Sequence, residues 1–247
     1  SCPLQMSDDD EKVALKAEVA ALKAEVLALK AAILARDVML DGTRGGGSAS
    51  SAPATSASTA PPLEVAAPAK IAAFWAMDKQ NLTDVIVPYG ATEIPKEAFM
   101  RCKRLATVVI PLTVRKIGDW AFYGCSLLTA IVIPDSVMSI EVGAFRACSS
   151  LTSIRIPKSV TTIGNGAFYG CWMLTSIVIP DSVATIRKGT FRGCSSLTSI
   201  VISDAVTTIE ECAFFGCTSL TTASIPSSAT LGIHVFYKSP TTVTTRG

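Results

Sequence analysis

Six cysteines of this chain recur every 23 residues, and they are the side chains whose type and spacing could do chemistry. They stand at Cys102, Cys125, Cys148, Cys171, Cys194 and Cys217. In stacked strands, about 4.8 Å apart, neighbouring members of such a column would have Cα atoms within disulfide range. Thiols in register point the same way, however, which disfavours the disulfide torsion, and ligands in one straight row do not make a tetrahedral metal site. We therefore expect a buried column of free thiols that pack as small apolar side chains, and no metal ligands.

The other reactive side chains lack the partners that catalysis needs. Cys212 stands where other units have Trp120 or a glycine, and His234 is the only histidine. A nucleophile needs a base beside it, and no such pair is indicated. The sequence also has no glycine-rich phosphate loop, no cluster with metal-ligand spacing and no close carboxylate pair. We predict that the protein is not an enzyme and needs no cofactor. Cys2 could cross-link two chains in oxidising surroundings, but we expect a free thiol there.

The cysteines belong to a longer repeating pattern that must position them. Each follows a phenylalanine by three residues and precedes a leucine by three, as Phe168, Cys171 and Leu174 illustrate. The stretch Leu-x-x-Ile-x-Ile that follows predicts a short strand, which ends at Pro111, Pro134, Pro157, Pro180 or Pro226. A second extended segment, such as Val137 to Ile140, should form the opposite wall. A fixed period of this size indicates a β-rich solenoid of 23-residue units with short parallel strands.

The ends of the repeat domain, which we place at residues 70–240, depart from the pattern as solenoid caps do. At the front, a short apolar helix that contains Phe74 and Trp75 should cover the first unit, and Lys79 replaces the cysteine. At the back, Phe236 follows Phe214 by 22 residues and Ser239 replaces the cysteine. We expect this shortened, polar unit to end the stack.

Two motifs of the repeat carry a family resemblance. Leu128-x-x-Ile131-x-Ile133-Pro134 and Gly166-Ala167-Phe168-x-Gly170-Cys171 resemble the BspA-like (Treponema-type) leucine-rich repeats, and the resemblance covers residues 80–237. It implies a leucine-rich-repeat solenoid without enzymatic activity. Some members of that family are surface adhesins of bacteria and parasitic protists, so the resemblance makes a secreted or cell-surface adhesin one expectation.

Residues 7–41 predict one long N-terminal α-helix that pairs as a parallel coiled coil. β-Branched residues and leucines each recur every seventh position, at the a and d positions typical of a two-stranded coiled coil. These dimerisation residues are Leu15, Val19, Leu22, Val26, Leu29 and Ile33. Glutamates at 11, 18 and 25 each precede a lysine by five residues, a spacing that suits bridges between two parallel helices. An alanine-rich solitary helix is the alternative. Residues 43–69, rich in Gly, Ser, Ala, Thr and Pro, predict a flexible linker.

Two outward rows of the solenoid are the candidate binding surfaces. The residue between the two inward isoleucines of each strand must face out, which defines the Val stripe: Ile86, Val109, Val132, Arg155, Val178, Val201 and Ser224. The residue after each repeat phenylalanine defines the Arg/Tyr row: Met100, Tyr123, Arg146, Tyr169, Arg192, Phe215 and Tyr237. We expect the stripe either to bind a partner or to reflect β-propensity alone, and the row either to stack internally or to form a hot spot. Trp120 and Trp172 are unique to their units and indicate ligand-specific surface.

Composition limits the class of partner. The chain has 247 residues, a net charge of +2 and 17% charged residues, which gives no reason to expect nucleic acid, and no apolar run long enough for a membrane span. We predict a protein-binding scaffold that forms a homodimer through its N-terminal helix. The alternatives are an adhesin with a glycosylated linker and a subunit that docks on a larger assembly through the helix. The absence of a signal peptide and the thiols predict a cytoplasmic location, or an extracellular one if a leader is missing. Asn81 then forms a glycosylation sequon with Thr83.

Overall fold

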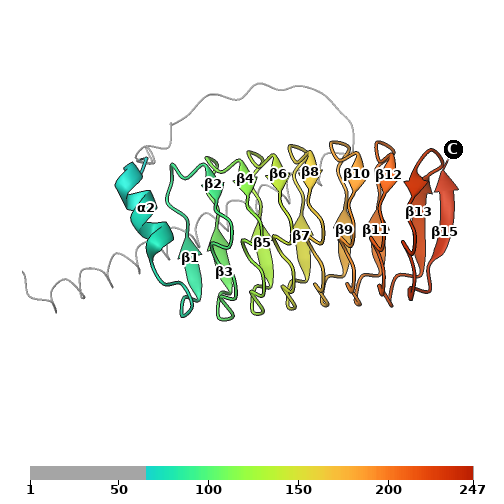
Figure 1. Ribbon diagram of the computed structural model, residues 1–247, viewed down its shortest axis with the longest axis horizontal. Coiled ribbons are helices and arrows are strands. Elements are labelled where there is room, and N and C mark those ends of the chain that lie inside the picture. The colour runs from blue at the N-terminus through green and yellow to red at the C-terminus, as the bar shows by residue number, and fades with distance from the viewer. Residues whose placement is uncertain (1–64, 247) are drawn as a thin grey trace, which may run out of the picture. The chain divides into compact units, whose positions relative to one another are not determined.

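The computed structural model of the protein describes residues 65–246, which form a solenoid (Figure 1). The predicted helix and dimerisation residues of 7–41, and nearly all of the linker at 43–69, lie outside the described residues. One helix, α2 (Pro68–Ala76), stands at one end of the stack. Two rows of strands run from it to the other end, as Figure 1 shows. We call each repeat of the chain a coil.

The strands of the two rows, apart from β15, have the positions that the sequence pattern predicts. The first row consists of β1 (Asp84–Ile86), β3 (Thr107–Val109), β5 (Ala130–Val132), β7 (Ser153–Arg155), β9 (Ser176–Val178), β11 (Ser199–Val201), β13 (Thr222–Pro226) and β15 (Thr242–Arg246). The second row consists of β2 (Glu93–Ile94), β4 (Lys116–Ile117), β6 (Ser139–Ile140), β8 (Thr162–Ile163), β10 (Thr185–Ile186), β12 (Thr208–Ile209) and β14 (Thr230–Leu231).

All pairing between these strands is parallel, and it follows the 23-residue repeat except for the pairs β12–β14 and β13–β15 at the end of the chain. Ile131 of β5 lies opposite Ile154 of β7, and Ile117 of β4 lies opposite Ile140 of β6. The turn that carries the repeat phenylalanine forms a further ladder, because the N–H of Phe145 donates to the carbonyl oxygen of Ala167 in the next coil at 2.8 Å. Each coil is therefore bonded to the next on more than the two predicted walls, which satisfies the backbone polar groups of the turns.

The core is a stack of phenylalanine rings along the solenoid. Successive rings from Phe99 to Phe236 have centroids 5.2–5.5 Å apart, with interplanar angles of at most 11°. This spacing lies within the range of favourable offset stacking, worth about 0.5–1.5 kcal/mol per pair beyond the buried area. Leucine and isoleucine side chains of the strands pack around the rings and are almost fully buried. The inward positions that the period predicts therefore make one continuous core.

The front cap is the predicted apolar helix. The Trp75 ring of α2 meets the Phe99 ring edge-on, with centroids 5.9 Å apart. Lys79, which stands in the place of a cysteine, is buried at 6% exposure, and its Nζ donates to the carbonyl oxygens of Trp75 and Met77 at 2.8 and 2.9 Å. Burial lowers the pKa of the Lys79 amine. The lysine thereby ties the end of the helix to the first coil.

The back of the solenoid differs from the expectation that a shortened, polar unit ends the stack. Phe236 continues the ring stack, but β15 follows it and pairs with β13 over the whole length of both strands. The regular elements therefore run from Pro68 to Arg246 and extend beyond residues 70–240 at both ends. None of the helices in the described part of the chain is both long and apolar enough to span a membrane.

Candidate functional site

The cysteine column is buried as predicted, but it does more than fill space. Each thiol from Cys125 to Cys217 donates a hydrogen bond to the carbonyl oxygen of a phenylalanine in the preceding coil, with Sγ–O distances of 3.1–3.2 Å. All the repeat cysteines are free thiols. Within residues 65–246, no group of three or more His, Cys, Asp or Glu side chains is placed to hold a metal ion.

Burial also makes these thiols poor nucleophiles. It raises the pKa of Cys148, Cys171 and Cys194 well above the usual value, and it raises the pKa of Cys217 to about 12. The cause in each case is desolvation of the thiolate, because an ion without water or a cation beside it is unfavourable in an apolar interior. The reactive thiolate form is therefore suppressed near neutral pH.

Cys212 and His234 occupy a strained position of the coil. Their φ angles are both 56°, and Trp120 has the same value, whereas Gly143 and Gly166 stand at this position in other coils with φ of 60° and 58°. The turn requires the left-handed conformation, which glycine adopts without steric cost. The His234 ring packs edge-on against Tyr237, with centroids 5.2 Å apart. The Cys212 thiol donates a long hydrogen bond to the carboxylate of Glu211, with 3.9 Å between Sγ and Oε1.

The Val stripe lies on the solvent-facing side of the first row of strands. Val132, Val178 and Val201 are 57%, 59% and 54% exposed, while their strand neighbours Ile131 and Ile177 are buried. Ile86 is 36% exposed and Val109 is half-buried. Parallel pairing places Ile86 beside Val109, Val132 beside Arg155 and Val178 beside Val201, in three sheets that follow one another along the first row. The structure therefore brings the predicted stripe residues together as an exposed apolar row.

A single charged residue interrupts the stripe. Arg155 occupies the stripe position of β7 and pairs with Asp135, with 3.2 Å between Nη1 and Oδ1. Both side chains are mostly exposed, at 70% and 73%, so solvent screens the pair and it contributes little stability. The row beside the stripe consists of small residues, mostly Ser and Thr, which leave the valine side chains prominent. This face can bury apolar groups of a partner.

The Arg/Tyr row stacks internally, which is one of the two arrangements expected for it. The Arg146 guanidinium lies 4.2 Å from the centroid of the Tyr169 ring, and the Arg192 guanidinium lies 4.3 Å from that of Phe215. Arg192 also lies 5.7 Å from Tyr169, and Arg101 lies 6.0 Å from Tyr123. Cation–π contacts of this kind contribute about 0.5–1 kcal/mol each at exposed sites.

Beside the Arg/Tyr row lies a groove of about 270 Å³, which we call the Arg groove. Its lining comprises Trp120, Val142, Arg146, Asn165, Gly166, Tyr169, Lys188, Gly189, Arg192 and Cys212. The Trp120 ring covers Gly143, where an added Cβ would lie 2.9 Å from the ring. Trp172 is 58% exposed but does not line the groove. The sequence nominated Arg146, Tyr169 and Arg192 as members of one row and Trp120 as a residue unique to its unit, but it did not predict the hollow that joins them.

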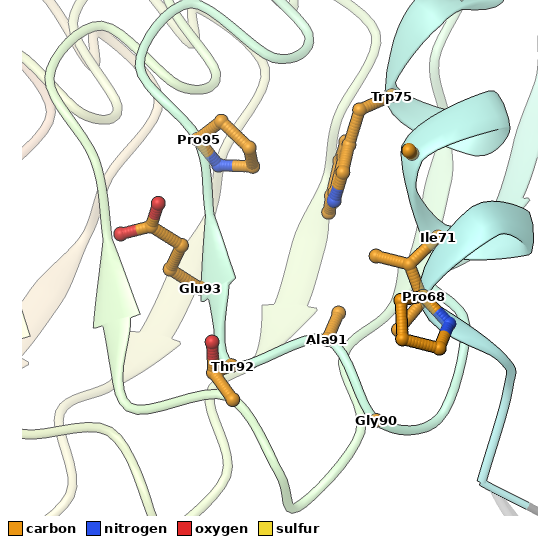
Figure 2. A pocket seen from close by; sticks show the side chains of 9 residues that line it. Pro68, Ile71, Trp75, Gly90, Ala91, Thr92, Glu93 and Pro95 are labelled. Carbon is orange, nitrogen blue, oxygen red and sulfur yellow. The ribbon is translucent and has the colours of Figure 1, made fainter.

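A second cleft, of about 420 Å³, lies between α2 and the first coil. Figure 2 shows Trp75 and Ile71 projecting from the helix side toward Ala91 and Pro95. The one acidic residue of the lining, Glu93, projects to the other side of its strand from Trp75. The cleft is a seam between cap and solenoid, with no group placed to act on a ligand.

Comparison with known proteins relates the sequence to one family and to several solved structures. Residues 70–131 and 126–243 match the pattern described as "BspA type Leucine rich repeat region (6 copies)". A leucine rich cell surface protein of Faecalibacterium prausnitzii is similar, with 36% identity and a TM-score of 0.62 over 67% of this chain and 48% of that protein. No curated protein matches the chain.

Two further solved structures have the same repeat architecture. The Treponema pallidum leucine rich repeat protein is 32% identical, with a TM-score of 0.58, over 64% of this chain and 78% of its own. A leucine-rich repeat protein of Bacteroides ovatus is 32% identical, with a TM-score of 0.53, over 68% of this chain and 51% of its own. The chain thus spans about half the length of the F. prausnitzii and B. ovatus proteins.

Proposed function

Because the chain belongs to the BspA-type leucine-rich repeat family, we propose that it is a non-catalytic protein-binding module whose contact surface is the Val stripe. The proposal rests on the exposure of Val132, Val178 and Val201, which occupy equivalent positions in the first row of strands. Parallel sheets are normally covered on both faces. Here one face is buried in the core, and the other presents more than half of each of these valines to water.

Energetic considerations support the stripe as a contact surface. Covering a fully exposed valine side chain contributes about 1.5–3 kcal/mol, and contiguous exposed apolar surface is a common mark of an interaction site. The small residues beside the stripe allow a partner to approach the valines closely. Arg155 would set the register of the partner along the stack, because its charge disfavours an apolar group at β7.

The similarity to cell-surface proteins supports an extracellular location rather than the cytoplasmic one that the sequence suggested. The F. prausnitzii relative is described as a leucine rich cell surface protein. Free thiols are compatible with an extracellular location here, because the repeat cysteines are buried and burial raises the pKa of their thiols, as at Cys148. We therefore propose a surface-exposed binding protein, for which Asn81, exposed in a turn, remains the predicted glycosylation site.

Dimerisation through residues 7–41 stays part of the proposal and would make the binding surface bivalent, which increases avidity for a clustered partner. Light scattering on the full chain tests it. We expect a dimer that becomes a monomer on substitution Leu22→Asp at a d position, while Ala24→Asp on the outer surface of the predicted helix leaves the dimer intact. A monomeric wild-type chain at micromolar concentration would contradict this part.

The binding function itself is tested by affinity capture with the full chain as bait. The variant Val132→Asp/Val178→Asp places two carboxylates on the stripe, whereas Leu112→Asp/Met138→Asp places two on exposed apolar residues outside it, at 70% and 51% exposure. We expect the wild type and the second variant to retain the same partner, and the first variant to lose it. Equal capture by all three proteins would remove the stripe from the proposal.

A further inference from the structure

The Arg groove is a second, chemically different surface. Its floor is formed at Gly166 and Gly189, where an added Cβ would meet no atom closer than 3.6 Å and 3.8 Å. The absence of side chains at these two positions leaves a trough across two coils. The Trp120 ring, which lies over Gly143 in the preceding coil, closes one end of this trough, and Cys212 stands at the other.

Trp120 occupies its place at a conformational cost. Its φ of 56° lies in the left-handed region, which a bulky side chain disfavours and which glycine provides in the next three coils. Cys212 and His234 share this conformation at the same place in their coils, so what singles out Trp120 is its ring, which lies over Gly143 at the edge of the hollow. The Trp120 ring also contacts one of the cationic side chains of the groove, because the Arg146 guanidinium lies 5.5 Å from the centroid of the ring.

Two guanidinium groups, those of Arg146 and Arg192, belong to residues that line this hollow, and neither has an acidic partner among the described residues. Arg146 and Arg192 lie on opposite sides of Tyr169, at 4.2 and 5.7 Å from its centroid. Within residues 65–246, neither guanidinium forms an ion pair or a side-chain hydrogen bond. Lys188, by contrast, is neutralised by Glu211, at 2.7 Å. A guanidinium stacked on a ring keeps its in-plane N–H groups free for a planar acceptor.

We propose that the Arg groove binds an acidic segment of a protein partner, with glutamate or aspartate carboxylates on Arg146 and Arg192. The planar fork of arginine matches a carboxylate in bidentate geometry. The apolar floor and the Trp120 ring suit the methylene stem of a glutamate better than the hydroxyl-rich body of a sulfated sugar. The two arginines stand two coils apart, about 10 Å at strand spacing, a distance that an extended segment of three or four residues spans. This site uses no residue of the Val stripe, so a negative result at one surface does not contradict the proposal for the other.

Calorimetric titration of the full chain at low salt tests the assignment. The probes are a capped peptide of six glutamates, the matched peptide of six glutamines, and a fully sulfated heparin hexasaccharide. We expect the glutamate peptide to bind and the glutamine peptide not to bind. Arg146→Gln/Arg192→Gln should weaken binding at least tenfold, while Arg104→Gln/Arg115→Gln removes the same charge from exposed arginines outside the groove and should change the affinity less than threefold.

The stacked arginines also contribute packing, so a loss of affinity in the double variant must be distinguished from a loss of folding. A second variant serves this purpose. Asn165→Glu places a carboxylate on the exposed edge of the groove, leaves both arginines in place, and should also weaken binding at least tenfold. Thermal unfolding of each variant shows that the solenoid is intact. Equal affinity of the two double variants, equal binding of the two peptides, or binding of the heparin fragment without binding of the glutamate peptide would each overturn the proposal.

Discussion

The thiol of Cys148 donates a hydrogen bond to the carbonyl oxygen of Phe122, 26 residues earlier, with 3.1 Å between Sγ and O. The same oxygen also accepts the backbone N–H of Cys125, at 3.2 Å. The thiol therefore satisfies the second lone pair of a buried carbonyl and ties one coil to the one before it. At the last coil, Ser239 makes the equivalent bond to Phe214, at 2.8 Å.

The hydrogen bond predicts an order of stability among substitutions at Cys148. Cys148→Ala removes the donor and leaves a small void, and should lower the free energy of unfolding by about 1–2 kcal/mol. Cys148→Ser keeps a donor, as Ser239 does naturally, and should cost less than the alanine variant. Urea unfolding measures both. If the thiols acted only as small apolar side chains, serine would cost more than alanine, which would contradict this role.

The buried thiols predict a loss of stability in alkaline solution. The pKa of Cys217 is raised to about 12 in the folded protein, whereas a thiol in an unfolded chain has a pKa of about 8.5. The stabilisation from the protonated thiol is complete below pH 8.5 and is lost as the pH rises toward 12, because the unfolded state then releases its proton first.

Comparison with Cys217→Ser isolates this effect, since all other titrating groups are shared. Between pH 9 and pH 11, the stability of the wild type relative to the variant should fall by about 1.4 kcal/mol per pH unit. Urea unfolding at each pH provides the measurement. A constant difference between the two proteins across this range would show that Cys217 is not desolvated.

The left-handed turn positions predict a stabilising glycine substitution. Ala147 has a φ of 57°, whereas the corresponding Gly170 and Gly193 of the next coils have 71° and 73°. Ala147→Gly should raise the free energy of unfolding by about 1 kcal/mol, because the left-handed conformation costs a Cβ-bearing residue about 1–2 kcal/mol.

Ala144→Gly is the matched control for that substitution. Ala144 is fully buried and lies outside the residues with positive φ. The same chemical change should there lower stability, by about 1 kcal/mol, through lost packing and greater freedom of the unfolded chain. Thermal or urea unfolding of both variants checks the pair. Destabilisation of similar size at both positions would contradict the turn argument.

The sequence alone was sufficient for features that depend on periodicity. Ile131 is buried and Val132 is exposed because adjacent residues of a strand face opposite sides, so the repeat predicted both the core and the Val stripe. The stacking of Arg146 on Tyr169 was one of the two arrangements expected from their equivalent places in successive coils.

Features that depend on coil-to-coil geometry could not be predicted. The hydrogen bond from Cys148 to Phe122 depends on the orientation of a carbonyl group in another coil. That orientation cannot be inferred from the spacing of residues in the sequence. The Arg groove arises because Trp120 covers Gly143 while Gly166 and Gly189 leave a trough, a relationship among four coils. Strand β15 was missed because Thr242–Arg246 lacks the Leu-x-x-Ile-x-Ile pattern, although it pairs with β13 as the other strands do.

The central claim is that the Val stripe forms the contact surface of a non-catalytic binding protein. The most direct test is the affinity of the captured partner for the wild type, for Val178→Asp and for Met138→Asp, measured by calorimetry on full chains. Val178 and Met138 are similarly exposed, at 59% and 51%, but only Val178 lies on the stripe. We expect Val178→Asp to weaken binding at least tenfold, about 1.4 kcal/mol, and Met138→Asp to leave it unchanged. Equal affinity of Val178→Asp and the wild type would contradict it.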